Sequence, residues 1–117
     1  MTKILYSPES RADSLEIRLY ITNELKNPTA AANLLATIKR KIFLLKASPL
    51  MGTLIDDELN VESKYRFLIC NSYYIFYRIE SDSVKIVRII SQRRDYMRIL
   101  FGDNVLHENI ASSYQII

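Results

Sequence analysis

The stretch YYIFYRIESDSVKIVRIIS, Tyr73–Ser91, decides the fold. Apolar and aromatic residues alternate with polar ones on both sides of Ser81-Asp82, which indicates two strands joined by a tight turn. A two-residue turn sets Glu80 opposite Ser83, and the side-chain period of two then sorts the hairpin into two faces. The predicted first face holds Tyr74, Phe76, Arg78, Lys85, Val87 and Ile89. The predicted second face holds Tyr73, Ile75, Tyr77, Ile79, Val84, Ile86, Arg88 and Ile90.

The flanking segments extend this hairpin into an α+β domain over residues 1–102. KYRFLIC (64–70) reads as a further strand, so that 64–70, 73–80 and 83–91 form a three-stranded antiparallel meander. KILYS (3–7) is a short N-terminal strand. SPES then favours a helix with Ser7 as N-cap and Pro8 in the first turn, running to about residue 26. Residues 103–117 are a tail with no clear pattern.

Two helices in antiparallel arrangement fill the space between the first strand and the meander. KNPT ends the first helix, and the second runs from residue 29 or 30 to about 47. Asp95 is placed to cap a short final helix. The expected apolar stripe of the first helix is Ala12, Leu15, Leu19 and residues 21–25, and that of the second is Ala31, Leu34, Leu35, Ile38, Ile42 and Leu45.

The two faces of the meander differ in chemistry. The second face is the more continuous apolar surface and suits packing under the helices. The first face mixes aromatic rings with Arg78 and Lys85, and such a surface is unusual when nothing covers it. We therefore expect something outside the chain to cover it at least part of the time.

Charge and composition narrow the functional classes. The chain has 117 residues, enough for one domain, and a net charge of +3. Residues 61–102 hold eight basic and four acidic residues, which favours an acidic partner or nucleic acid, although a solvated basic surface fits equally well. The N-terminus does not resemble a signal peptide and no window approaches a membrane span, so we expect a cytoplasmic protein.

Most catalytic constellations are missing from the sequence. One histidine, His107, and one cysteine, Cys70, exclude a zinc site built from Cys and His. There is no Gly-rich phosphate loop. Asp56, Asp57 and Glu58 read as a solvated loop rather than a metal site, and no cofactor is expected. Arginine, lysine and tyrosine remain, which could bind phosphates or support RNA cleavage.

The segment QRRDYMRILF after the last strand concentrates that chemistry. It holds Arg93, Arg94, Tyr96 and Arg98. These arginines could meet an anionic partner. Arg93 and Arg94 could also pair with Asp95 or with the 56–58 carboxylates, or Arg93 and Arg98 could only tie the C-terminal turn to the domain. Composition alone favours the internal pairing.

At family level, the chain resembles the RelE/ParE superfamily of type II toxin–antitoxin toxins. The resemblance rests on the order of elements, on SPLMG (48–52), and above all on YYIFYR followed by VKIVRI and RRDYMRIL. It covers about residues 3–102 and implies a helix hairpin packed on one sheet face. It also implies a small acidic antitoxin that wraps the toxin as a hetero-oligomer.

The superfamily divides by target, and the resemblance implies different site residues for each branch. RelE-like members cleave mRNA on the ribosome, and ParE-like members poison DNA gyrase. Arg93 matches the post-strand arginine of the nucleases, Lys64 and Arg66 are rough substitutes for their lysines, and Tyr96 precedes the expected tyrosine position near Ile99. Tyr74 replaces their in-strand arginine, which favours the ParE-like branch.

For that branch the expected partner-binding or nucleic-acid-binding residues are Tyr74, Arg78, Lys85, Arg93, Arg94 and Arg98. The RelE-like ribonuclease, with Arg93, Tyr96, Arg66 and Lys64 as catalytic residues and no metal, is the alternative. A non-toxic relative that only binds a partner is a second alternative.

Overall fold

The computed structural model of the chain describes residues 2–56 and 63–102. The elements follow the order β1 (Lys3–Tyr6), α1 (Pro8–Leu19), α2 (Pro28–Phe43), β2 (Thr53–Leu54), β3 (Arg66–Cys70), β4 (Tyr73–Glu80) and β5 (Ser83–Ser91). A one-turn π-helix (Tyr20–Glu24) extends α1, and two 3₁₀ turns (Leu44–Lys46 and Pro49–Met51) follow α2. Residues 96–102 form a short helix after β5. The predicted tail 103–117, with His107, lies outside the described residues.

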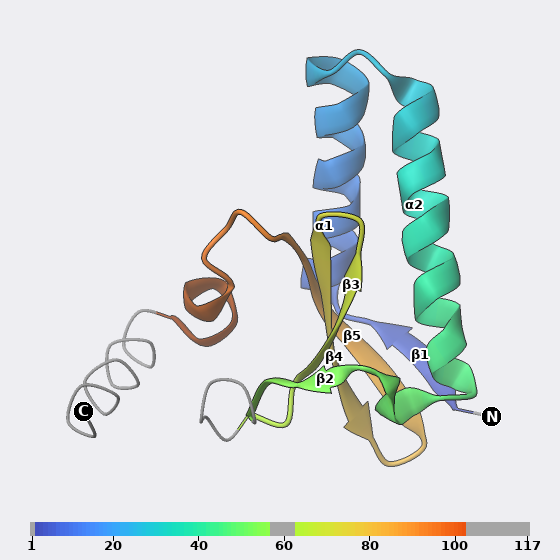
Figure 1. Cartoon of the computed structure of the whole chain (residues 1–117), viewed down its shortest axis with the longest axis vertical. Coiled ribbons are helices and arrows are strands. Elements are labelled where there is room, and N and C mark those ends of the chain that lie inside the picture. The colour runs from blue at the N-terminus through green and yellow to red at the C-terminus, as the bar shows by residue number, and fades with distance from the viewer. Residues whose placement is uncertain (1, 57–62, 103–117) are drawn as a thin grey trace.

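One five-stranded sheet has the order β1-β5-β4-β3-β2. The meander β3-β4-β5 is antiparallel, as predicted, and β1 joins it in parallel with Lys3 opposite Ser83. The two-residue β2 was not predicted from the sequence. Figure 1 shows the helix hairpin standing over one side of the sheet, while the short C-terminal helix lies on the other side of the molecule.

Local sequence signals explain both helix starts. The Ser7 side chain accepts the Ser10 N–H at 2.9 Å, and Asn27 accepts the Ala30 N–H at 3.1 Å, each followed by proline in the first turn. Between the helices, Lys26 takes a left-handed conformation with φ of 51°, which reverses the chain.

The core between the helices and the sheet is aliphatic. Residues of α2 predicted to face the sheet are buried there, including Ala31, Ile38 and Ile42, and they meet Ile75, Val84 and Ile86. Each fully buried aliphatic side chain contributes about 1.5–3 kcal/mol through removal of its surface from water. The apolar stripe predicted for the second helix is thus confirmed.

The stripe predicted for the first helix is wrong in part. Leu15 and Leu19 are 56% and 49% exposed, whereas Ser10, Asp13 and Ile17 face the sheet. Two polar residues are tolerated inside because Ser10 donates to the Ser7 carbonyl and Asp13 accepts several hydrogen bonds. The helix therefore turns its leucines outward.

A β-bulge changes the predicted faces of the hairpin. Glu80 lies opposite Ser83 as predicted, but Tyr77 pairs with Ile86 while Phe76 pairs with Arg88, so that Val87 is the extra residue. An extra residue reverses the alternation of all side chains beyond it. Ile89 therefore joins the core under the helices and Ile90 the opposite face, each the reverse of its predicted side.

The backbone groups at the bulge are satisfied by α1. Ser7 donates its hydroxyl to the Val87 carbonyl at 2.6 Å, and the Ile89 N–H donates to Asp13 at 2.8 Å. Asp13 also binds the Arg88 guanidinium through two hydrogen bonds of 2.8 Å. These contacts fix the N-terminal half of α1 to β5 and account for an arginine within an apolar strand.

The sheet face away from the helices, predicted as the first face, is aromatic and is partly covered within the chain. Phe76 and Ile90 are buried there, and Tyr96, Ile99 and Leu100 of the C-terminal helix pack on them. Tyr96 lies 5.1 Å from the ring of Tyr74 and 5.2 Å from that of Phe76. The sequence led us to expect that something outside the chain covers this face at least part of the time; over its aromatic half, Tyr96, Ile99 and Leu100 of the chain itself provide a cover.

Candidate functional site

A groove of about 670 Å³ lies between α1 and the adjoining ends of β4 and β5. Its helical wall comes from α1 and the π-helical turn, and its other wall from the β3–β4 turn and the segment after β5. The residues lining it are Asp13, Glu16, Ile17, Tyr20, Leu25, Ser72, Tyr73, Ile89, Ser91, Arg93 and Arg94. Two of the arginines singled out from the sequence, Arg93 and Arg94, line this groove.

Hydrogen bonds fix the backbone that presents Arg93 and Arg94. The Gln92 N–H donates to the Ser72 carbonyl at 2.9 Å, and the Arg94 N–H donates to the Ser91 carbonyl at 3.0 Å. The Arg93 N–H donates to the Ser91 hydroxyl at 3.2 Å. The chain after β5 is thus a tight turn held to the β3–β4 turn, while both arginine side chains are exposed.

The guanidinium groups of Arg93 and Arg94 keep their charge available. Within residues 2–56 and 63–102, no carboxylate lies within ion-pair distance of either group. Asp13 in the groove wall is already neutralised by Arg88, whose guanidinium has its pKa raised first by the hydrogen bonds to that carboxylate. Glu16 is the remaining acidic group in the lining. Two adjacent cations with one exposed carboxylate suit an anionic ligand.

The internal pairing of Arg93 and Arg94 that composition favoured is not found among the described groups. Asp95 faces Arg98 at 4.0 Å and accepts the Arg98 N–H, so it serves the C-terminal helix. Asp56 accepts hydrogen bonds from Ser63 and Lys64. Residues 57 and 58, the other carboxylates considered for this pairing, lie outside the described residues.

Two tyrosines give the groove a polar, aromatic wall. Burial, and to a smaller degree the neighbouring Tyr20, raises the pKa of Tyr73 above its ordinary value of 10.0. The Tyr73 hydroxyl is therefore protonated at neutral pH and available to donate a hydrogen bond. Together with Arg93 and Arg94 it supplies hydrogen-bond donors on this side of the groove.

The other cations expected on the sheet lie away from this groove. Arg78 and Lys85 stand directly opposite each other on β4 and β5, and like charges in that position destabilise a strand pair. The Arg78 guanidinium lies 5.3 Å from the Tyr65 ring, a cation–π contact that offsets part of this repulsion. Arg78 is exposed and Lys85 partly buried, on the aromatic side of the sheet.

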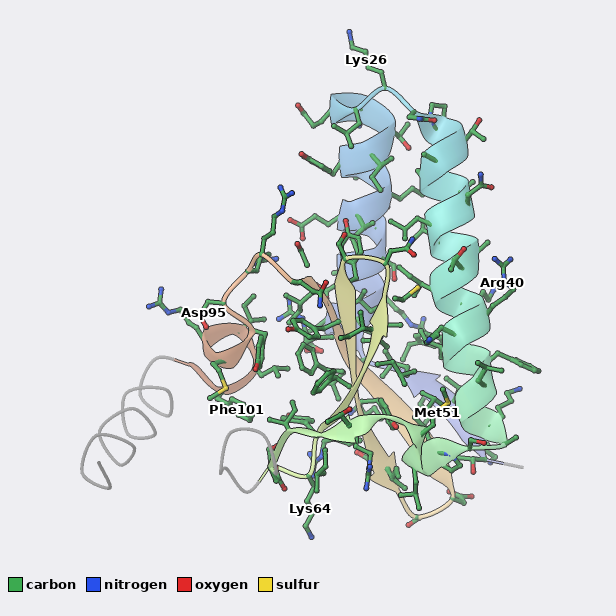
Figure 2. All side chains as sticks on the ribbon, in the orientation of Figure 1. Lys26, Arg40, Met51, Lys64, Asp95 and Phe101 are labelled. Atoms are coloured by element: carbon green, nitrogen blue, oxygen red, sulfur yellow. The ribbon has the colours of Figure 1, made fainter. Side chains whose placement is uncertain are left out.

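Arg66 and Lys64 lie at the opposite end of β3 from the groove. Arg66 pairs with Tyr77, whereas Cys70, four residues further along β3, pairs with Tyr73 of the groove. The Arg66 guanidinium donates to the carbonyls of Gly52 at 2.8 Å and Leu50 at 3.4 Å. Figure 2 shows Lys64 at the foot of the molecule, well apart from Asp95.

Tyr74 and Tyr96 belong to the aromatic cluster rather than to the groove lining. Their rings contact each other, and Tyr74 also meets Phe67 at 5.4 Å. The structure thus gathers Arg93 and Arg94 in the groove and does not bring Lys64 and Arg66 to them. No helix in the described part is both long and apolar enough for a membrane span, and no described set of three or more His, Cys, Asp and Glu side chains could hold a metal ion.

Comparison with known families decides the assignment. The family described as ParE toxin of type II toxin-antitoxin system, parDE, matches residues 4–96, which run from β1 through Tyr96. The chain belongs to the ParE toxin family. The resemblance to the RelE/ParE superfamily inferred from YYIFYR and RRDYMRIL is thereby confirmed.

The fold of this ParE family member recurs in a solved structure. A chain in a structure of the chromosomal ParDE TA system from P. aeruginosa superposes with a TM-score of 0.64 at 18% sequence identity. The match covers 78% of this chain and 96% of the other. At that identity the match shows the fold alone, and it agrees with the predicted α+β order of elements. A search of curated proteins found no match to the sequence.

Sequence reasoning missed half of the groove in this ParE family member. Glu16, Tyr20 and Ser72 join it only because the hairpin and the β3–β4 turn meet there. One signal was available: Arg88 interrupts an apolar strand, and Asp13 falls three residues after Ser10 and four before Ile17 on the same helix face. An arginine that is largely withdrawn from water needs a carboxylate partner, so the pair could have been predicted.

Proposed function

We propose that the chain is the toxin of a type II toxin–antitoxin module and inhibits growth by binding and poisoning DNA gyrase. Membership of the ParE family supports the first part of this proposal. The second part rests on the arrangement of the charged side chains. A toxin that acts by binding needs an exposed, charged surface, whereas a nuclease needs acid, base and phosphate-binding groups around one bond.

The four residues considered for nuclease chemistry lie apart from one another. This observation supports gyrase rather than mRNA as the target. Arg93 lines the groove beside α1, while the Arg66 guanidinium is engaged by the carbonyls of Leu50 and Gly52 at the other end of β3. Tyr96 packs against Phe76, and Lys64 is on the Arg66 side. Four residues so distributed do not surround one phosphodiester.

The groove supports recognition of an anionic group on the target. Arg93 and Arg94 are exposed, consecutive and unpaired with any described carboxylate, and their backbone is held by the Ser72 and Ser91 contacts. Because the backbone is already ordered, binding costs little beyond the ordering of two side chains. A carboxylate of the enzyme or a phosphate of its DNA fits the same two guanidinium forks.

A cognate antitoxin is the partner that this function requires. An acidic arm laid across the groove would pair with Arg93 and Arg94 and so compete with the target. The exposed Arg78, opposite Lys85, is a second cationic contact that such an arm could use. The toxin and antitoxin then form a hetero-oligomer in which the toxin is inactive.

The test measures the effect of the chain on gyrase and on mRNA, and it compares one double variant in the groove with one control double variant elsewhere. We expect the purified chain to reduce supercoiling by gyrase and to accumulate linear DNA, with mRNA left whole in induced cells. Arg93→Ala with Arg94→Ala should lower this activity at least tenfold, if each guanidinium contributes about 1 kcal/mol or more. Arg18→Ala with Arg40→Ala removes the same charge from exposed helix positions and should change activity less than twofold.

Codon-positioned mRNA cuts, abolished by Arg93→Ala, would instead establish the ribonuclease. Growth unaffected by expression, combined with an intact antitoxin complex, would favour the non-toxic relative. Co-expression with the adjacent reading frame tests the antitoxin. If the product of that frame neither binds the chain nor restores growth, the toxin–antitoxin module is removed from the proposal.

A further inference from the structure

The outer side of α1 carries an apolar stripe that the core of the domain does not use. Four exposed residues recur there at spacings of four, three and four, which places them along one line of the helix: Pro8, Ala12, Leu15 and Leu19. The two leucines are about half exposed, and the buried residues of α1 lie on the opposite side, toward the sheet. The helix is therefore apolar on two sides, and only one of them is covered by the domain.

The two flanks of this stripe carry opposite charges. Arg11 lies on the flank toward α2, because it lines a hollow together with Lys39 of that helix. Glu16 lies on the other flank, in the wall of the groove that holds Arg93 and Arg94. Arg18 repeats the positive charge seven residues after Arg11. Glu9 repeats the negative charge seven residues before Glu16. One flank of α1 is therefore basic and the other acidic.

These flanking charges are available to a partner. Within residues 2–56 and 63–102, no group of opposite charge lies within ion-pair distance of any of the four side chains. The pattern is that of a short heptad seam, with apolar residues at positions a and d, an acid at e and a base at g. In such seams the a and d side chains bury one another, and the e and g charges select the partner and its orientation.

The charges on the two flanks match a second copy of the same chain in one orientation. If two copies of α1 run parallel about a twofold axis, the basic flank of each lies against the acidic flank of the other. Arg11 at position g of one copy then meets Glu16 at position e of the other, and the same pair forms a second time by symmetry. Antiparallel copies would instead place like charges together. A partner of one charge would match only one flank.

We propose that the chain pairs with a second copy of itself through the outer side of α1, with the two helices parallel. Leu15 and Leu19 of each copy cover those of the other, and the small Ala12 allows the helices to approach closely. The seam ends at Leu19, because the π-helical turn Tyr20–Glu24 changes the rotation of the side chains beyond it. A seam this short supports a weak, reversible pair rather than an obligate dimer.

This pairing goes beyond the proposed function and is tested without gyrase, DNA or antitoxin. Glu16 also lines the groove, so self-association is measured on the chain alone. A chain that poisons gyrase but stays monomeric would leave the proposed function intact and overturn the pairing. A chain that pairs but leaves gyrase unaffected would do the reverse.

Analytical ultracentrifugation over a concentration series at low salt measures the pairing. We expect a reversible monomer–dimer equilibrium in the full chain. Leu15→Ser with Leu19→Ser should weaken it at least tenfold, because the apolar centre of the seam is lost. Leu44→Ser with Leu50→Ser removes two leucines of similar exposure that lie outside the stripe and should change the dissociation constant less than twofold.

Charge exchange tests the orientation at exposed positions where the fold should tolerate substitution. In the Arg11→Glu chain both cross-pairs join two carboxylates, and in the Glu16→Arg chain both join two guanidiniums. Each variant alone should therefore pair about tenfold more weakly than the wild type. Mixed in equal amounts, the two variants regain both opposite-charge pairs and should associate with each other about as well as the wild type does with itself. These differences should shrink at high salt.

Three results would overturn the proposal. The first is a wild-type chain that stays monomeric at every concentration. The second is equal weakening in the two leucine double variants, or a pair that persists in Leu15→Ser with Leu19→Ser, since either would assign self-association to another surface. The third is a mixture of Arg11→Glu and Glu16→Arg that associates no better than each variant alone, since the parallel arrangement requires the two to complement each other.

Discussion

Replacing Asp13 by alanine should be among the most destabilising single changes in this domain. The Asp13 side chain is 95% buried and makes two hydrogen bonds of 2.8 Å to the Arg88 guanidinium and one of 2.8 Å to the Ile89 N–H. Asp13→Ala removes all three at once. It leaves a guanidinium without its counter-ion and a backbone donor without an acceptor, in the wall of the groove.

The magnitude follows from these contacts. Removing one member of a buried ion pair costs about 3–5 kcal/mol. The Arg88 side chain is 22% exposed, so water replaces part of the lost interaction and the lower value, about 3 kcal/mol, applies. The unsatisfied Ile89 N–H adds about 1 kcal/mol. The free energy of unfolding should therefore fall by about 4 kcal/mol, and Tm by about 16 °C for a domain of this size.

Guanidinium denaturation and thermal scans of three variants test this reasoning. Asp13→Asn keeps an oxygen for the Ile89 N–H and should lose about half as much as Asp13→Ala. Asp13→Leu combined with Arg88→Met removes the charge from both partners and should be more stable than Asp13→Ala, because no uncompensated ion remains. A loss below about 1 kcal/mol in Asp13→Ala would refute the argument, since it would mean that solvent already screens the pair.

Three further perturbations follow from the loop between α2 and β2 and from its neighbours. Tyr77→Phe removes a hydroxyl that donates to the Pro49 carbonyl at 2.7 Å and accepts the Gly52 N–H at 2.8 Å, so we expect a loss of about 2–3 kcal/mol in urea denaturation. Gly52→Ala places a Cβ 2.5 Å from the Tyr77 hydroxyl and 2.8 Å from the Phe67 carbonyl, which should cost about 1–3 kcal/mol and less in the Tyr77→Phe background. Desolvation raises the pKa of Asp56, but the hydrogen bonds from Ser63 and Lys64 together outweigh it and hold that pKa below 3.8. The stabilisation from Asp56 should therefore be complete above about pH 4 and decline as the pH falls further, and the urea midpoint of Asp56→Asn should fall less between pH 5 and pH 3 than that of the wild type.

Periodicity predicts most of this fold because it reports burial directly. The alternation in Tyr73–Ser91 and the spacing of Ala31, Ile38 and Ile42 by seven and four residues each follow from one side of the element facing the same core. The cap residues Ser7 and Asn27 mark the helix starts for a local reason, namely that their side chains accept N–H groups three residues ahead. Such signals lie within a few residues of the structure they specify.

The errors arise where distant residues decide the outcome. The bulge at Val87 depends on Ser7 and Asp13, about 80 residues earlier in the chain, which satisfy the backbone groups that the ladder leaves unpaired. No alternation pattern contains that information, so the sides of Ile89 and Ile90 were assigned in reverse. The outward positions of Leu15 and Leu19 have the same origin, because the Asp13 contact sets the rotation of α1.

Of the residues that line the candidate site, the sequence predicted only the two arginines. Arg93 and Arg94 stand out in the sequence because they directly follow an apolar strand, and both line the groove. Arg66 shows the limit of that reasoning: a cation on a strand reads as a possible ligand for phosphate, but here it closes a loop through the Gly52 carbonyl. Residue type alone does not distinguish a guanidinium that holds the chain together from one that meets a partner.

The parallel pairing of β1 with β5 has a consequence for biosynthesis. Lys3 lies opposite Ser83, and Ser7 bonds to Val87, so the first strand has no sheet to join until nearly the whole domain has been translated. Contacts of such long sequence separation form late and slowly. The sheet is therefore incomplete until β5 has emerged, and a nascent chain cannot adopt the finished fold before nearly the whole domain has been translated.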